Sequence, residues 1–385
     1  MLFGANRLCV GCCDTIDPVA EIDFSLLDVP RETPPDDADL YLRAAMGWHF
    51  GADTGSPFWL RAARDLDFDP RSDVRSFADL RLFPNLVDQL RSVPVEDLIP
   101  RGYGSPLPIP RIYESGGTTG APKRTAQLPD WVEQVTRWQV EDFTTGGFVP
   151  GRGLLCVMPS GPHGVGHFDR EVAERLGSTF HPIDLDPRWV KKLAARGTRR
   201  ATVEVAAYVD HIVDQARFIL ETQSVANLHA TPPLLEAMAR DDDLVELINQ
   251  KIRYAVLSGA HVDLDTLDVF REEFPDTTVA TVFGSTMILS QTATRVCADR
   301  QFVFDPRTPY VVFWVVDQNT GEQVPYGERG QVVMNHVSKG MFIPNNLERD
   351  TAIRTPGPAG HVGDSVSEVA PVAVFGGEPV IEGVY

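Results

Sequence analysis

Four short apolar runs, separated by helix-like segments, most narrowly limit what this chain can fold into. The runs are Gly153–Met158, Val225–Ala230, Ile252–Ser258 and Thr278–Phe283, and a long amphipathic stretch over Val203–Leu220 lies between the first two. Parallel neighbouring strands need a crossover of a dozen or more residues, which is usually a helix. The alternation therefore predicts an α/β fold with mostly parallel sheets and flanking helices. The same region is expected to hold helices at Glu171–Leu176, Pro232–Ala239 and Leu264–Phe274, and an extended segment at Thr179–Ile183.

The two flanking regions have different patterns. Apolar residues before position 110 recur at helical spacing, and those after position 301 gather in Val-rich runs separated by turns. Helices are predicted at Asp36–Phe50, Pro57–Arg64 and Phe83–Leu90, and strands at Tyr310–Val316, Gly330–His336 and His361–Val369. We expect a helical N-terminal part over residues 1–110, an α/β core over 111–300 and a small β-rich subdomain over 301–385.

A glycine-rich stretch just after the N-terminal region carries the strongest chemical signal. It reads Ser115-Gly116-Gly117-Thr118-Thr119-Gly120-Ala121-Pro122-Lys123. Glycine permits the tight turns in which successive N–H groups converge on one anion, and the hydroxyls and Lys123 add donors and positive charge. The stretch is not a Walker A loop, because Pro122 replaces the second glycine of that motif and Arg124 replaces its Ser or Thr. It predicts a binding loop for a nucleotide triphosphate.

Charge and segment composition exclude several classes of partner. The chain has a formal net charge of −19, from 35 basic and 54 acidic side chains. Such a chain repels nucleic acids and anionic membrane surfaces, so we expect a small-molecule or protein partner. No apolar run reaches transmembrane length, and the N-terminus lacks the pattern of a signal peptide, which predicts a cytoplasmic protein.

The cysteines and histidines do not form a recognisable metal motif. Cys9, Cys12 and Cys13 lie close together at the N-terminus, but no second cysteine pair or suitably spaced histidine pair accompanies them. His163 and His167 are four residues apart in a segment rich in glycine and proline. We therefore expect reduced structural thiols rather than a zinc or redox site, and we assign no metal ligands.

The stretch from Ser115 to Lys123 resembles the phosphate loop of the adenylate-forming superfamily, whose members include acyl-CoA synthetases and luciferases. Those enzymes join a carboxylate to AMP, so the resemblance implies ATP and Mg²⁺ as cofactors and a carboxylic acid as substrate. It also implies the α/β N-terminal core of that superfamily, binding nucleotide and substrate within residues 111–300. The family normally continues into a mobile C-terminal domain of roughly a hundred residues. Only about twenty residues follow Asp364 here, so no such lid domain is expected.

Three shorter stretches refine the resemblance to a branch. Ser56-Pro57-Phe58-Trp59 and Leu82-Phe83-Pro84, with Val74-Arg75-Ser76-Phe77-Ala78-Asp79-Leu80 between them, resemble the start of phenylacetate-CoA ligases and luminescence-type acyl-protein synthetases. A core without the lid is similar to stand-alone ligase-like proteins of antibiotic pathways, including phenazine biosynthesis. The resemblance therefore implies a place in natural-product biosynthesis.

Later motifs of the family occur in the expected order. Pro159 followed by His163 resembles a segment in which the family lines its carboxylate pocket. Ser258-Gly259-Ala260 follows a predicted strand and resembles the turn whose backbone faces adenine. Because small residues leave main chain bare, a flat ring can approach there.

The segment Phe283-Gly284-Ser285-Thr286-Met287 resembles the family's Y-G-x-T-E motif. Phe283 would stack on adenine and Thr286 would donate to the α-phosphate. Met287 stands where the family has a glutamate that binds Mg²⁺, and a thioether is a poor ligand for a hard cation. Either phosphates, water and another carboxylate hold the ion, or adenylation is weak or lost. Asp364, in His361-Val362-Gly363-Asp364, resembles the aspartate that binds both ribose hydroxyls.

These residues lead to one preferred function and two alternatives. The preferred function is an acid ligase that forms an acyl-adenylate, with Lys123, Thr286 and His163 as catalytic residues and the acyl group passing to a partner enzyme or carrier. The first alternative is a non-catalytic protein that binds nucleotide or acyl groups on the same fold. The second is an acyl-protein synthetase, in which the thiol of Cys156 or Cys297 would be acylated.

Overall fold

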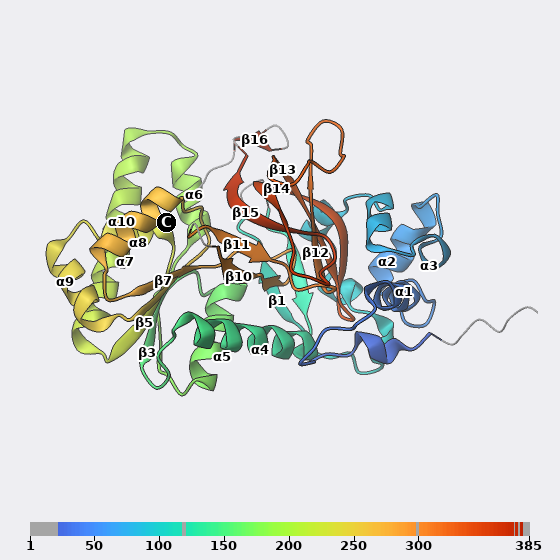
Figure 1. Ribbon diagram of the computed structural model, residues 1–385, viewed down its shortest axis with the longest axis horizontal. Helices are drawn as coiled ribbons and strands as arrows, with labels where there is room; N and C mark the ends of the chain where they lie inside the picture. The colour runs from blue at the N-terminus through green and yellow to red at the C-terminus, as the bar shows by residue number, and fades with distance from the viewer. Residues whose placement is uncertain (1–21, 118–120, 298–299, 373, 376–377, 380–385) are drawn as a thin grey trace, which may run out of the picture.

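The structure is a computed structural model that describes residues 22–117, 121–297, 300–372, 374–375 and 378–379. Three parts follow one another along the long axis: N-terminal helices, a central antiparallel sheet, and a parallel sheet covered by helices (Figure 1). The cysteine cluster at Cys9, Cys12 and Cys13 lies outside the described residues, as do Thr118, Thr119 and Gly120. Within the described residues, none of the helices combines the length and apolar content that crossing a membrane requires.

The five-stranded parallel sheet confirms the alternation predicted from the apolar runs. Its order is β4 (Phe180–Pro182), β3 (Gly153–Val157), β5 (Val225–Ala230), β6 (Tyr254–Leu257) and β7 (Thr278–Thr281). All six residues of β5 are buried, as expected for a strand with helices on both faces. The connecting helices are α5 (Gly164–Arg175), α6 (Pro187–Ala194), α7 (Arg199–Thr222), α8 (Pro232–Met238), α9 (Asp242–Lys251) and α10 (Leu264–Glu273).

Local sequence fixes where these helices begin. Asp186, Asp241 and Asp263 each accept a hydrogen bond from a backbone N–H in the first turn of α6, α9 and α10, respectively. Such N-caps satisfy donors that would otherwise have no partner. Proline occupies the first helical position of α6 and of α8, where its missing N–H costs nothing.

A six-stranded antiparallel sheet forms the centre of the molecule. Its order is β10 (Ala293–Val296), β11 (Phe302–Asp305), β15 (Asp364–Pro371), β14 (Phe342–Pro356), β13 (Arg329–Val337) and β12 (Val311–Val316). Three of these strands match the Val-rich runs, but the long strand β14 is not predicted by the sequence pattern. Smaller pairs are β1 (Arg111–Glu114) with β2 (Arg124–Gln127), β8 (Gly284–Ser285) with β9 (Ser290–Gln291), and β16 (Val374–Phe375) with β17 (Glu378–Pro379).

The pairing of β14 with β13 is irregular at two points, between Gln331 and Val333 and between Met334 and His336, and the first of these faces the cavities. Gln331 of β13 pairs with Thr351, and Val333 pairs with Leu347. Three residues of β14, 348–350, therefore stand opposite the single residue Val332. A bulge bends its strand and re-aims the extra side chains.

The N-terminal part is helical, but less regularly than predicted. It contains α1 (Ala38–His49), α2 (Pro57–Ala62) and α3 (Pro70–Asp73), as well as the 3₁₀ turns Phe24–Leu27, Ala63–Asp65, Phe77–Leu82, Val87–Arg91, Val95–Leu98 and Arg101–Tyr103. The predicted helix over Phe83–Leu90 is confirmed only in its second half, which is the 3₁₀ turn Val87–Arg91, and its first half is not helical. Phe83 is extended, with φ −73° and ψ 138°, because the residue before a proline is disfavoured in the helical region.

Four buried side chains attach these helices to the turn between β13 and β14. The Tyr41 hydroxyl donates to the carbonyl of residue 337 at 2.8 Å, and the Trp48 indole donates to that of residue 339 at 2.9 Å. His49 Nε2 lies 2.7 Å from the carbonyl of residue 338, and the Trp59 indole donates to that of residue 342 at 2.9 Å. The helices and this turn also share one apolar core.

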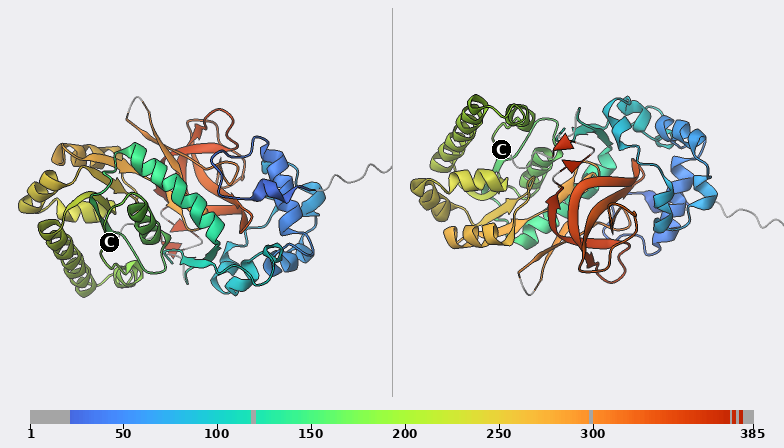
Figure 2. Two further views of the ribbon diagram at one scale, coloured as in Figure 1. Left: turned by 90° about the horizontal axis from the view of Figure 1, so that it is seen from below. Right: turned by 90° about the horizontal axis from the view of Figure 1, so that it is seen from above.

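Helix α4 (Pro129–Gly146) connects the two halves of the molecule. Figure 2 shows it running beside both the central sheet and the parallel sheet. Trp131, near its start, is buried against Tyr310 and His336 of the central part. Phe143, near its end, packs on Tyr254 of β6. One rigid helix thus fixes the position of each sheet relative to the other.

Replacing Trp59 by phenylalanine should destabilise the protein, because it leaves the buried carbonyl of Phe342 without a donor and opens a cavity. We expect the free energy of unfolding to fall by about 2–4 kcal/mol, measured by urea denaturation. Trp189→Phe is the matched control, since Trp189 is 42% exposed on α6, and it should change stability by less than about 0.5 kcal/mol. Equal effects of the two substitutions would contradict this description of the core.

The buried imidazole of His49 should make stability depend on pH. Burial lowers the pKa of His49 to about 4, whereas in the unfolded chain it stays near its ordinary value of about 6.5. Between these values only the unfolded state takes up the proton, so the free energy of unfolding falls as the pH drops from about 6.5 toward 4. His49→Gln should lessen this decline by up to about 1.4 kcal/mol per pH unit, measured by denaturation at several pH values. Parallel pH profiles for the two proteins would disprove the assignment.

Candidate functional site

Two adjoining cavities lie between the parallel sheet, the central sheet and the β1–β2 hairpin. The hairpin cavity, of about 320 Å³, is lined by Ser115–Gly117, Lys123, His163 and Thr286, among others. The Phe283 cavity, of about 470 Å³, is lined by Ala260, Phe283 and the side of β15. Both volumes are typical of small-molecule sites. Six residues line both cavities and so form their common wall: Lys191, Gly259, Val282, Gly284, Arg349 and Asp350.

The predicted phosphate loop is the connection of the β1–β2 hairpin. Two hydrogen bonds of 2.9 Å close its base: Ser115 N–H donates to the Lys123 carbonyl, and Lys123 N–H donates to Ser115 Oγ. Gly117 has φ +62°, a conformation that favours glycine. A Cβ at Gly116 would lie 3.0 Å from Lys191 Nζ, so a side chain there would require the lysine ammonium to shift. Ser115, Gly116 and Gly117 all line the hairpin cavity.

Positive charges gather around this loop. The Lys123 side chain is 15% exposed, and burial lowers its pKa, opposed by the nearby carboxylates of Glu348 and Asp88. Lys191 Nζ donates to the Gly116 carbonyl at 3.4 Å. Burial, and then the neighbouring charges of Arg349 and Arg188, lower the pKa of Lys191 to about 8. Mutual repulsion between cations in a confined space is relieved when an anion binds among them.

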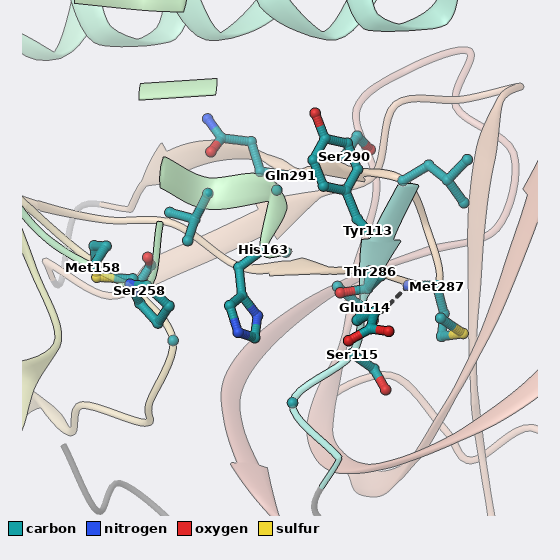
Figure 3. Close-up of a pocket in the computed structure, with 18 of the residues that line it drawn as sticks. Tyr113, Glu114, Ser115, Met158, His163, Ser258, Thr286, Met287, Ser290 and Gln291 are labelled. Atoms are coloured by element: carbon teal, nitrogen blue, oxygen red, sulfur yellow. Dashed lines mark hydrogen bonds between the residues drawn. The ribbon is translucent and has the colours of Figure 1, made fainter. Parts of the chain in front are cut away.

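His163 lies where the sequence places it, in the residue that precedes helix α5. Its ring points into the hairpin cavity, between Ser258 on one side and Thr286 and Glu114 on the other (Figure 3). Burial, and then the charges of Arg188 and Lys191, lower its pKa to about 4. The imidazole is therefore neutral at pH 7 and can accept or donate a hydrogen bond without adding charge.

The turn that joins β8 to β9 brings the next motif to the same cavity. Ser285 and Thr286 are half-buried in its wall, and Phe283 stands in the second cavity, packed on Phe304 at 5.7 Å between ring centroids. Met287 is 3% exposed and packs into the apolar core of the N-terminal helices. It also lines the hairpin cavity, where its thioether is a poor ligand for a hard cation.

Glu348 of the β14 bulge supplies a carboxylate beside this turn. Its Oε1 accepts hydrogen bonds from Asn346 Nδ2 at 2.7 Å and from Ser285 Oγ at 3.5 Å. No group of three or more His, Cys, Asp or Glu side chains within the described ranges is arranged to hold a metal ion. One carboxylate in the cavity wall fits a Mg²⁺ ion that takes its other ligands from phosphates and water.

The residues of the turn after β6 face different cavities. Gly259 has φ +80° and lines both cavities, and Ala260 lines the Phe283 cavity. Ser258 instead lines only the hairpin cavity, and its hydroxyl lies 2.7 Å from His229 Nε2. The bare backbone at Gly259 and Ala260 leaves room for a flat ring beside Phe283.

Asp364 is not brought to the cavities, whereas Asp350 is. Asp364 is 1% exposed, and it accepts hydrogen bonds from Arg354 Nε at 2.8 Å and from the backbone N–H of Val315 at 3.1 Å. Burial raises its pKa, opposed by Arg354. Asp350, which belongs to none of the sequence motifs, lies in the common wall of both cavities. The sequence signal was the charged triplet 348–350 between the apolar residues Leu347 and Ile353.

The two described cysteines, Cys156 and Cys297, form no disulfide, and the predicted thiol cluster at Cys9, Cys12 and Cys13 lies outside the described residues. Cys156 is fully buried in β3, and burial, together with the neighbouring Asp169 carboxylate, raises its pKa. Cys297 lies after β10 and lines neither cavity. Neither thiol is placed as a nucleophile facing the hairpin cavity.

Comparison with known proteins supports the fold and does not test the roles of individual residues. No protein-family model and no curated protein sequence matches this chain. Among solved structures, 2-hydroxyisobutyryl-CoA ligase in the postadenylation state with 2-HIB-AMP is similar, with a TM-score of 0.60 and 16% identity over 96% of this chain and 75% of that one. Its open conformation with 2-HIB-AMP and CoA matches with a TM-score of 0.57 and 16% identity, over 94% of this chain and 85% of that one. The chain therefore has the α/β fold of an acyl-CoA ligase.

The depressed pKa of Lys191 is open to direct measurement. With lysine side chains labelled for NMR, one resonance should titrate near pH 8, well below the ordinary lysine value of about 10.4, and be absent in Lys191→Arg. Arg349→Gln removes a repelling charge and should raise the midpoint of that titration. A midpoint near 10 in the unmodified protein would show that the cations are not crowded as described.

Proposed function

We propose that this protein joins the carboxylate of an aryl or acyl acid to AMP, using ATP and releasing pyrophosphate. The observation that carries the proposal is the common wall of the two cavities. A glycine-rich loop with lysines lies at one end, an aromatic ring beside bare backbone lies at the other, and the Asp350 carboxylate lies between them. This is the order of triphosphate, ribose and base along a nucleotide.

The nucleotide would extend across both cavities. Adenine would stack on Phe283 beside the backbone of Gly259 and Ala260, with Gly284 and Ser285 at the turn beneath it. A carboxylate can accept two hydrogen bonds from a vicinal diol, so Asp350 is suited to the ribose in place of Asp364. The phosphates would lie against Ser115, Gly116 and Gly117, and against Thr118, Thr119 and Gly120 of the same loop.

In the reaction, a carboxylate oxygen of the acid attacks the α-phosphorus, and the bond to pyrophosphate breaks. Negative charge that develops on the phosphates would be met by Lys123, Lys191 and Arg349, and the Thr286 hydroxyl would donate to the α-phosphate. Lys191 supplies, from within this core, a positive charge beside the loop. Mg²⁺, when held by Glu348 and the phosphates, would neutralise further phosphate charge.

The remaining part of the hairpin cavity would hold the acid. Tyr113 and Phe168 present aromatic rings 5.9 Å apart between centroids, and Met158 adds a polarisable apolar surface. His163, neutral at pH 7, would hydrogen-bond the carboxylate while adding no charge. This lining favours an aromatic acid over a short aliphatic one.

The wider setting rests on the sequence resemblance. It favours the phenylacetate-CoA ligase-like branch, a role in natural-product biosynthesis, and transfer of the acyl group to a partner enzyme or carrier. We likewise propose that the helical N-terminal part ends near residue 110 and that the α/β core ends near residue 300. Met287 favours the alternative of a protein that binds nucleotide without turnover, because the expected metal carboxylate is absent at that position.

ATP–pyrophosphate exchange with a panel of aromatic and aliphatic acids tests the proposal. Lys123→Met should lower exchange on the order of 10²–10³-fold, because it removes a preorganised positive charge from the loop. Lys192→Met is the matched control, since Lys192 is exposed on α6 and lines neither cavity, and it should leave the rate unchanged.

Background exchange with every acid, in a protein that is folded by circular dichroism, would rule out adenylation. If calorimetry then showed that ATP binds and that Lys123→Met abolishes binding, the non-catalytic alternative would hold.

A further inference from the structure

An aspartate, a histidine and a serine from three different elements form a hydrogen-bonded chain in the wall of the hairpin cavity. Asp169 Oδ2 lies 2.8 Å from His229 Nδ1, and His229 Nε2 lies 2.7 Å from Ser258 Oγ. Asp169 is on α5, His229 is on β5, and Ser258 directly follows β6. The aspartate and histidine are 2% and 1% exposed, whereas Ser258 is half-buried at the cavity.

The geometry assigns each group a role. Because Asp169 can only accept at Oδ2, Nδ1 of His229 carries the proton, and Nε2 is left to accept one from the Ser258 hydroxyl. Cys156 Sγ also donates to Asp169 Oδ2, at 3.2 Å, which helps to fix that carboxylate. An oriented base beside a hydroxyl is the arrangement that activates a serine nucleophile.

We infer that Ser258 is a nucleophile that takes the acyl group from the adenylate as an ester. The inference rests on the proposed function for its acyl donor. Figure 3 shows Ser258 beside Met158, across the cavity from Ser115 and Thr286, with His163 between the two sides. An acyl-adenylate held by Thr286 would therefore lie in the same cavity as this hydroxyl.

The step balances with the groups present. The Ser258 oxygen forms a bond to the acyl carbon, the bond from that carbon to the phosphate oxygen breaks, and AMP leaves as an anion. The hydroxyl proton passes to Nε2 of His229, whose positive charge is stabilised by Asp169. The protonated His229 then releases its proton to solvent. An amine, thiol or water attacks the ester carbonyl and gives its proton to Nε2 of His229, which passes it to the serine oxygen as the bond between that oxygen and the acyl carbon breaks.

The alternative is that these residues only tie α5, β5 and β6 together as a buried polar cluster. The two roles differ in reactivity, because a purely structural serine has ordinary nucleophilicity. An alkyl fluorophosphonate, which labels activated serines without ATP, separates them. We expect the full-length protein to be labelled at Ser258, located by peptide mass spectrometry.

Substitutions of His229 and Asp169 test whether His229 acts as the base for Ser258. His229→Gln and Asp169→Asn should slow labelling of Ser258 by 10²-fold or more, the usual contribution of a positioned base. Ser290→Ala is the matched control, since its hydroxyl lines the same cavity without a histidine partner and its loss should leave labelling of Ser258 intact. A folded protein that is not labelled at Ser258, or whose labelling is equally fast in His229→Gln, would overturn the inference. If the histidine variant does not fold, the label position in the unmodified protein still decides.

A second measurement separates this inference from the proposed function. With ATP, Mg²⁺ and an acid that supports pyrophosphate exchange, intact-mass analysis should show an acyl adduct that hydroxylamine removes and that Ser258→Ala lacks. Exchange without fluorophosphonate labelling would overturn the nucleophile and leave adenylation standing. Labelling without exchange for any acid would support the nucleophile and remove adenylation as its acyl source.

Discussion

The buried hydrogen bonds between the N-terminal helices and the backbone of residues 337–342 are the constraint on which the site depends. Tyr41, Trp48, His49 and Trp59 reach the carbonyls of this turn from one side. A carbonyl buried without a donor would cost about 1–3 kcal/mol, so each contact holds the backbone in place. Because the turn leads directly into β14, it sets where the bulge of that strand meets the cavities.

Several positive side chains meet at one cavity, although the chain as a whole is strongly acidic. The chain as a whole carries −19, yet Lys123, Lys191 and Arg349 converge on one cavity. Burial and mutual repulsion keep the pKa of Lys191 near 8, so the cations are held in a state that an anion would relieve. The same cavity is also lined by Glu114, Asp169, Glu348 and Asp350, so the cations lie among carboxylates. The acidic exterior would repel a long polyanion more than a small ligand held inside the cavity.

Some elements and site residues could be predicted from the sequence alone, and others could not. Strands β3, β5, β6 and β7 were predictable because each lies in a short apolar run bounded by segments with helical spacing, and the turn at Ser115–Gly117 because glycine favours tight turns. Strand β14 was not, because Asn, Pro and four charged residues interrupt its apolar alternation. Lys191 and Asp350 were missed for a different reason, because only the packing of distant elements brings them to the cavities. The chain of Asp169, His229 and Ser258 spans 89 positions and has no local pattern, since only the parallel sheet brings its members together.

The bulge at residues 348–350 also limits how this protein can change over evolutionary time. Three consecutive side chains stand opposite Val332, and a deletion of two codons there would restore a regular ladder with β13. Such a deletion would be easy for the sheet to accept, yet it would withdraw Glu348, Arg349 or Asp350 from the walls they form. Length conservation across this short segment should therefore distinguish descendants that keep the site from those that retain only the scaffold.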